Sequence, residues 1–160
     1  MEDEVIMAPV TGEIIDLKQV NDGIFSSEFM GKGAAIIPKE GIVLSPCNGL
    51  VTATSPTGHA YGLKSDGGAE LLIHLGIDTV ELNGASFESF VKKRQRVVKG
   101  EKIAELRLQM IKDCHLDPAV IIVVTNSADY ASVKRNKQKR IASGGKLLFL
   151  KAQSENSRAV

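Results

Sequence analysis

Two histidines, His59 and His74, are the residues whose type and spacing suggest chemistry. His74 lies inside a branched apolar run, where an unpartnered polar ring costs free energy on burial. Between the two, Asp66 and Gly67 predict a tight hairpin turn, because both central residues of such a turn need positive φ. A turn centred on this dipeptide pairs His59 with His74, with Cβ atoms roughly 4.5–5.5 Å apart. A three-residue loop would instead send the two rings to opposite faces.

Two facing imidazole rings have few uses. They can ligate a metal ion, or they can transfer a phosphoryl group with one ring as nucleophile and the other bonded to the phosphate. They can also form a solvent-facing polar pair of no consequence. A neutral imidazole is a nucleophile at neutral pH, since its unperturbed pKa is about 6.5. Spacing alone leaves these alternatives open.

The elements that must position these rings are predominantly strands. Glycine and proline recur at intervals of roughly 8–12 residues with short β-branched segments between them, which predicts an all-β antiparallel β-sandwich or barrel. Residues 119–124 show no alternation and predict a strand buried on both faces. One or two very short helices are expected, at residues 86–91 and 108–113. Residues 18–33 form a longer loop with several apolar side chains.

Composition excludes several classes of protein. The 160 residues are enough for one domain, and a net charge of +1 gives no indication of nucleic-acid binding. No apolar run approaches the roughly 18–20 residues that span a membrane, and the acidic start is the reverse of a signal peptide. Cys47 and Cys114 lie far apart, which favours reduced thiols in a cytosolic protein. We therefore expect a cytoplasmic location.

A basic segment at residues 134–140 has five cations in seven residues. It has two interpretations, a patch for nucleic acid or anionic lipid, and a solvated hairpin tip. Its place between two apparent strands favours the hairpin tip.

Five motifs resemble one family in both order and spacing. The chain is similar to the glucose-type IIA domain of the bacterial phosphoenolpyruvate:sugar phosphotransferase system over roughly residues 4–151. The matching motifs are residues 22–26, 30–38, 45–49, 57–60 and 72–80. The resemblance implies a IIA domain at residues 4–152, after a tail at 1–3 and before a disordered tail at 153–160.

The resemblance also assigns roles in phosphoryl transfer. His74 becomes the phosphoryl acceptor and His59 the donor of a hydrogen bond to the phosphate, while Thr57 fixes the tautomer of His59. Binding of partner proteins falls to Phe25, Leu72 and Asp78: Phe25 and Leu72 in a shallow apolar depression, and Asp78 steering a cationic partner residue.

The partners implied are the phosphocarrier HPr as donor and a cysteine of a IIB domain as acceptor. The transfer needs no metal and no cofactor, nucleic acid has no part in it, and the membrane is involved only through the permease. Residues 125–130 look more like IIA domains of β-glucoside and sucrose permeases than the glucose protein. The sugar, and the choice between a free subunit and a part of a fused permease, stay open.

Two other functions are alternatives to the phosphocarrier. A regulatory module would inhibit transporters or kinases in its unphosphorylated form, with a zinc ion shared by His59, His74 and a partner carboxylate. A zinc peptidase of the lysostaphin type needs a carboxylate four residues after His59 and a histidine two after His74. Leu63 and Gly76 stand there instead, so the peptidase lacks its ligands.

The sequence departs from the family pattern at Arg94 and His115, where glycine is common, and at Arg107, where the family tends to have aspartate. A side chain at a glycine position with positive φ strains the backbone. All three positions are distant in sequence from the histidines.

Overall fold

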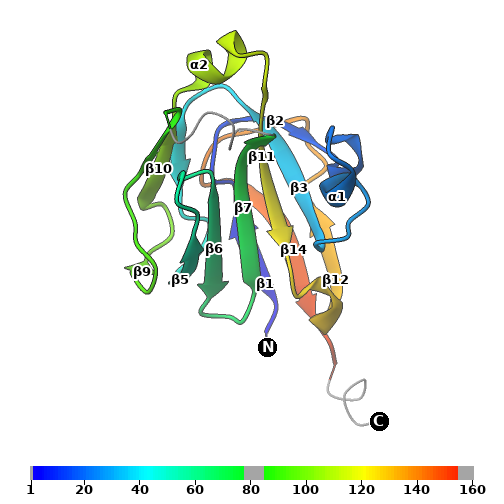
Figure 1. The fold of residues 1–160 in the computed structure, drawn as a ribbon. Coiled ribbons are helices and arrows are strands. Elements are labelled where there is room, and N and C mark those ends of the chain that lie inside the picture. Colours follow the sequence, from blue (N-terminus) through cyan, green and yellow to red (C-terminus); the bar gives the residue numbers. More distant parts are fainter. Residues whose placement is uncertain (1, 78–84, 155–160) are drawn as a thin grey trace.

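The computed structural model describes residues 2–77 and 85–154, which form three antiparallel sheets (Figure 1). The predicted all-β class with very short helices is confirmed. The strands are β1 (Glu4–Met7), β2 (Gly12–Ile15), β3 (Lys32–Pro38), β4 (Ile42–Leu44), β5 (Gly49–Thr54), β6 (Ala60–Ser65), β7 (Glu70–Ile77), β8 (Phe87–Ser89), β9 (Arg96–Val97), β10 (Lys102–Leu106), β11 (Asp117–Val124), β12 (Tyr130–Arg135), β13 (Arg140–Ile141) and β14 (Lys146–Ala152). The helical segments are η1 (Leu17–Gln19), α1 (Gly23–Ser26), α2 (Leu108–Asp113) and η3 (Ser127–Asp129).

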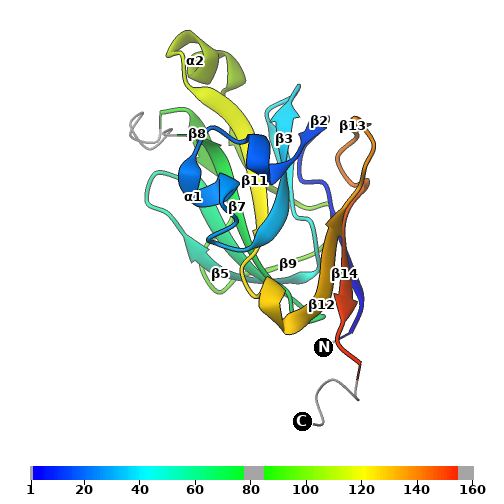
Figure 2. The same ribbon diagram turned by 90° about the vertical axis from the view of Figure 1, so that its right-hand side faces the viewer.

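The largest sheet has eight strands in the order β13-β2-β3-β11-β7-β6-β5-β9. Two three-stranded sheets, β1-β14-β12 and β4-β10-β8, complete the fold. Figure 2 shows β12 and β14 as a layer beside the large sheet. Side chains from all three sheets, such as Ile73, Leu148 and Ile103, form one continuous hydrophobic core. Burial of this apolar surface is the main force that holds the layers together.

A second, smaller cluster covers the opposite face of the large sheet. Leu17 of η1 and Phe25 of α1 pack there against Ile121 and Val123 of β11, and in Figure 2 α1 lies on the side away from β12 and β14. Val120, Ile122 and Val124 point instead into the main core. The prediction of a strand buried on both faces is therefore confirmed for β11. We call the side that carries the second cluster the outer face.

The hairpin of β6 and β7 differs in register from the prediction by one residue. Ala60 pairs with His74, and three residues, 66–68, separate Ser65 from Ala69. The amide of Ser65 donates to the Ala69 carbonyl at 2.8 Å, and the Ser65 hydroxyl accepts from the Ala69 amide at 2.8 Å. A turn does form on Asp66 and Gly67, because the Gly68 amide donates to the Ser65 carbonyl at 3.1 Å. The predicted two-residue hairpin loop is nevertheless wrong, since Ser65 bonds Ala69 with both its backbone and its side chain and closes a three-residue loop.

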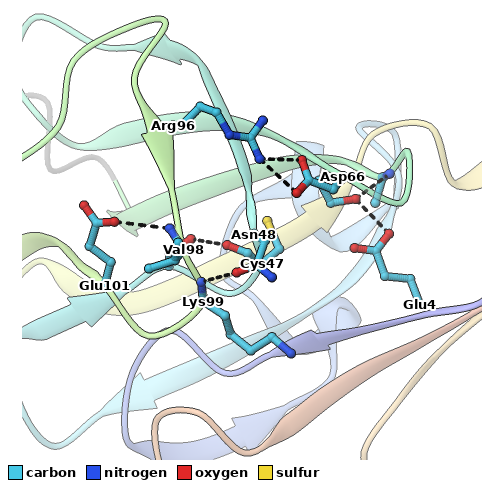
Figure 3. A network of polar contacts seen from close by, with 11 residues as sticks. Glu4, Cys47, Asn48, Asp66, Arg96, Val98, Lys99 and Glu101 are labelled. Atoms are coloured by element: carbon cyan, nitrogen blue, oxygen red, sulfur yellow. Dashed lines mark hydrogen bonds and ion pairs between the residues drawn. The ribbon is translucent and has the colours of Figure 1, made fainter.

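Neighbouring segments hold this loop from outside, as Figure 3 shows. The Asp66 carboxylate binds the Arg96 guanidinium through two bonds of 2.8 and 2.9 Å. The Asp66 amide donates to the carbonyl of Asn48 at 2.9 Å, and the Ser65 hydroxyl donates to Glu4 at 2.7 Å. Contacts from β1, β9 and the residue before β5 therefore favour the three-residue loop. Such contacts cannot be read from the hairpin sequence alone.

The two predicted helices had different outcomes. The one at residues 108–113 is confirmed as α2. The one at residues 86–91 is wrong, since Phe87 lies in β8 and pairs with Leu106 of β10. Phe87 is buried while Phe90 is exposed and lies under the Lys102 ammonium, 4.5 Å from the ring centroid. Pairing with β10 supplies the backbone hydrogen bonds that a single helical turn would supply poorly.

The basic segment at residues 134–140 is not a hairpin tip. It begins in β12, which pairs with β14, and ends in β13, which pairs with β2. It therefore connects two sheets, and the prediction of a hairpin was wrong. Arg135 within it forms an ion pair with Asp16 at 2.9 Å, and this contact lowers the pKa of the Asp16 carboxyl.

The remaining predictions concern single positions. Cys47 is buried and Cys114 exposed, and both are free thiols. Arg94 and His115 adopt left-handed backbone with φ of 76° and 58°, so the glycine usual there would relieve strain. Within residues 2–77 and 85–154, no helix is long and apolar enough to cross a membrane.

Candidate functional site

His74 lies on the outer face of the large sheet. It pairs with Ile121 of β11 in the ladder, and side chains of paired residues share a face. The His74 ring is half-buried and packs against Phe25 with ring centroids 5.2 Å apart. The imidazole of His74 therefore lies against the second hydrophobic cluster, next to Phe25 and across from Ile121.

His59 reaches the same place from the turn before β6. The His74 and His59 rings meet edge to face with centroids 5.2 Å apart. The Leu75 amide donates to the carbonyl of His59 at 2.7 Å, which ties the two segments together. The expectation that the rings face each other is confirmed. The expectation that a three-residue loop separates them is wrong, because His59 precedes the strand and is not bound by its alternation.

The hydrogen bonding of His74 determines which ring nitrogen carries the proton. Its Nδ1 lies 2.7 Å from the carbonyl oxygen of Gly76, and a carbonyl can only accept. Nδ1 therefore donates, and in the neutral ring Nε2 has the lone pair. Gly76 adopts a left-handed backbone with φ of 80°, a conformation that side chains rarely adopt.

The ring of His59 has two hydroxyls at Nδ1. Thr57 Oγ1 is in hydrogen-bond contact with this nitrogen, as the sequence analysis expected, and Ser55 Oγ lies 3.2 Å from it. Burial lowers the pKa of the His59 imidazole, so the ring is neutral at neutral pH. Sequence reasoning missed Ser55, although a serine just before a Pro-Thr-Gly turn is a known signal of a side chain that bonds the local backbone.

The residues assigned to partner binding have different environments. Phe25 is only 7% exposed, so its ring supports His74 and is not an open contact. Leu72 lies on the same face as His74, two residues before it on β7, and is partly buried. It lines a hollow of about 300 Å³ together with Met30. Asp78 lies outside the described residues.

Exposed apolar side chains lie in α1 and just after it. Ile24 within it is 56% exposed, and Phe29 just after it is 82% exposed. Asp22 caps this short helix by accepting from the Ile24 amide at 2.9 Å. The predicted loop therefore contains a short helix, and neither this helix nor the exposure of Ile24 was predicted from the sequence.

A metal site of the usual kind is not found among the described residues, where no group of three or more His, Cys, Asp or Glu side chains is placed to hold an ion. The arrangement around His59 and His74 is suited to a nucleophile beside a hydrogen-bond donor.

Comparison with known proteins identifies the family. Residues 4–130 match the model of the phosphoenolpyruvate-dependent sugar phosphotransferase system, EIIA 1. The chain is 38% identical to the glucose-specific EIIA component of Bacillus cereus over 132 residues, which is 82% of this chain and 80% of that protein. The structure matches the glucose permease IIA from Mycoplasma capricolum with a TM-score of 0.80 and 31% identity, covering 93% of this chain and 96% of the other.

Other relatives are much longer. The sucrose-specific EIIBCA component of Pediococcus pentosaceus is 46% identical over 157 residues, which is 98% of this chain but 24% of that protein. The chain thus spans about a quarter of the length of such fused relatives. The family match and the identities agree with the site geometry, and the chain belongs to the EIIA 1 family of the phosphoenolpyruvate-dependent sugar phosphotransferase system.

Proposed function

We propose that this domain is a phosphocarrier that accepts a phosphoryl group on His74 and passes it to a cysteine of a IIB domain during sugar uptake. The observation that supports this most directly is the contact of the His59 and His74 rings, 5.2 Å between centroids. The family supplies the reaction class. The regulatory alternative is not favoured by any contact among the described residues.

The chemistry follows from the protons of the two rings. Nε2 of His74 attacks the phosphorus of a donor phosphohistidine, and a new N–P bond forms as the donor's N–P bond breaks. The proton of His74 stays on Nδ1, held by the Gly76 carbonyl. His59 donates a hydrogen bond to a phosphoryl oxygen, which is the positioning and electrostatic help that such transfers require.

In the second step the phosphoryl group leaves His74 for the IIB domain. A thiolate on the IIB domain attacks phosphorus, an S–P bond forms, and Nε2 of His74 leaves with its lone pair restored. Between the steps the apolar neighbours Leu72 and Phe25 keep water from the phosphoryl group. Neither step consumes a metal ion or cofactor.

Two partners must dock on one histidine in turn. The relatives named as EIIBCA components support a IIB partner, and we propose HPr as the donor and the cytoplasm as the location. Ile24, Phe29 and Met30 provide exposed apolar surface beside the site, and such patches mark interaction surfaces. Since relatives with similar IIA parts are named for glucose and for sucrose, we place the choice of sugar outside this domain.

The test is transfer of radiolabel from phosphoenolpyruvate through Enzyme I and HPr to the purified domain. We expect one label per chain, bound through nitrogen and located on His74 by peptide mapping. Label that fails to appear with active HPr, or that appears on another residue, would reject the assignment.

A further inference from the structure

Ser55 sits beneath the turn that presents His59. Its hydroxyl oxygen accepts from the backbone amides of His59 and Ala60, both at 3.0 Å. The same serine closes the turn with its backbone, since its amide donates to the Ala60 carbonyl and its carbonyl accepts from the Gly58 amide, both at 3.0 Å. Four hydrogen bonds therefore fix the position and the direction of this hydroxyl.

The two amides determine what the hydroxyl offers to the ring. A serine hydroxyl has one proton and two acceptor lone pairs, and the amides of His59 and Ala60 occupy both lone pairs. Toward Nδ1 of His59, 3.2 Å away, only the proton remains. Nδ1 must therefore accept, which places the proton of the neutral ring on Nε2.

The Thr57 hydroxyl does not favour one tautomer of His59 over the other. Among the described residues its hydroxyl contacts only Nδ1 of His59, so it can rotate to donate to that nitrogen or to accept from it. Thr57 thus suits either tautomer, while Ser55 suits one.

We propose that Ser55 is the positioning residue that holds His59 in the tautomer with Nε2 protonated, and that Thr57 adapts to this choice. The value of that tautomer to phosphoryl transfer rests on the proposed function, because only a protonated Nε2 can donate to a phosphoryl oxygen. The tautomer itself does not depend on that function and is measurable in the unphosphorylated protein.

The experiment is nitrogen-15 NMR of the His59 ring in the full chain at a pH where the ring is neutral. The wild-type ring should show a protonated Nε2 and an unprotonated Nδ1. Ser55→Ala should lower the ratio of this tautomer to the other about fivefold, the effect of losing one ordinary hydrogen bond. Ser55→Thr keeps a hydroxyl and should restore the ratio.

Ser65→Ala is the matched control, because it removes a hydroxyl of similar bonding at the other end of the same hairpin. It should leave the His59 tautomer unchanged. A wild-type ring protonated on Nδ1, or an unchanged ratio in Ser55→Ala, would overturn the proposal. If Ser55→Ala disturbs the turn, as shifted amides of His59 and Ala60 would reveal, the wild-type tautomer and the Ser55→Thr variant still decide.

Transfer kinetics separate this proposal from the function. Ser55→Ala should slow onward transfer to a IIB cysteine about fivefold at saturating partner, with partner affinity unchanged. A Ser55-dependent tautomer without any phosphorylation of His74 would reject the phosphocarrier function and keep the role of Ser55. Phosphorylation that proceeds with a Ser55-independent tautomer would do the reverse.

Discussion

The two ends of the β6–β7 hairpin use the same arrangement for different purposes. At the loop end, the Ser65 hydroxyl accepts from the Ala69 amide and donates to Glu4 of β1. At the histidine end, the Ser55 hydroxyl accepts from two amides and faces the ring of His59. Ser65 joins two sheets, whereas Ser55 contacts the imidazole that we propose as the hydrogen-bond donor to the phosphoryl group. The acceptor of the hydroxyl proton, and not the turn itself, determines whether such a serine serves stability or chemistry.

Replacing His74 should abolish phosphoryl transfer at the histidine end and leave the loop end intact. His74→Gln leaves no ring nitrogen to accept the phosphoryl group, so labelling from HPr should vanish. The loop end is untouched, so the midpoint of urea denaturation should change little. Residual labelling on His59 in this variant would reverse the roles of the two rings.

Replacing His59 should affect the two transfer steps differently. His59→Gln keeps a donor of similar reach, so His74 should still be phosphorylated. Glutamine is a poorer anchor for the charge that develops in the transition state. Complete loss of one such donor costs about 2.7–4 kcal/mol, so this weaker donor should cost up to that amount. We expect label to accumulate on His74 and pass to the IIB cysteine slowly, measured by rapid quench. Onward transfer at the wild-type rate would remove His59 from the mechanism.

Removing the hydroxyl at the loop end should affect stability and not transfer. Ser65 is 3% exposed, and Ser65→Ala leaves the Ala69 amide and the Glu4 carboxylate without this partner. The loss of these two hydrogen bonds, one of them to a charged carboxylate, costs about 1–3 kcal/mol. The free energy of unfolding from urea titration should fall by that amount, with phosphoryl transfer from HPr unchanged. A variant as stable as the wild type would mean that Ser65 does not fix the loop.

The smallest effect concerns the charge on Glu4. Burial raises the pKa of this carboxyl above its usual 4.5, so the folded state binds a proton more tightly than the unfolded state. The contribution of Glu4 to the unfolding free energy should therefore fall as pH rises from 4.5 through the raised pKa. Glu4→Gln keeps an acceptor for Ser65 and has no such titration.

The measurement is a series of urea titrations of both proteins between about pH 4 and pH 7. This range begins near the usual pKa of a carboxyl group and extends above it. The variant should gain stability relative to the wild type as pH rises. A difference that is constant over this range would contradict the effect of burial on Glu4.

The features that the sequence could predict depend on local patterns. Glycine and proline spacing sufficed for the all-β class, and the unbroken apolar run of β11 sufficed for its burial on both faces. The meeting of His59 and His74 was also predicted, although from a register that is wrong by one residue. The prediction succeeded because His59 lies outside the ladder, where a shift of register does not turn its ring away.

The features that could not be predicted depend on partners distant in sequence. Glu4 lies 61 residues from Ser65, and Arg96 lies 30 residues from Asp66, yet both hold the loop that sets the register. Phe87 has helical spacing with Phe90, but β10 is available to pair with it. The contact of Ser55 with His59 was not predicted, because it depends on the hydrogen-bond geometry of the turn and not on residue type.

The pairing of β1 with β14 has a consequence for covalent attachment. Glu4 pairs with Leu150 and also reaches the hairpin loop, so both ends of the described chain lie at that end of the domain (Figure 1). His74 stands five residues beyond Ala69, about 17 Å away at the usual rise of a strand. A flexible tether joined to either end would leave the ring pair uncovered. Its length would set the effective concentration of an attached partner without obstructing one that arrives from solution.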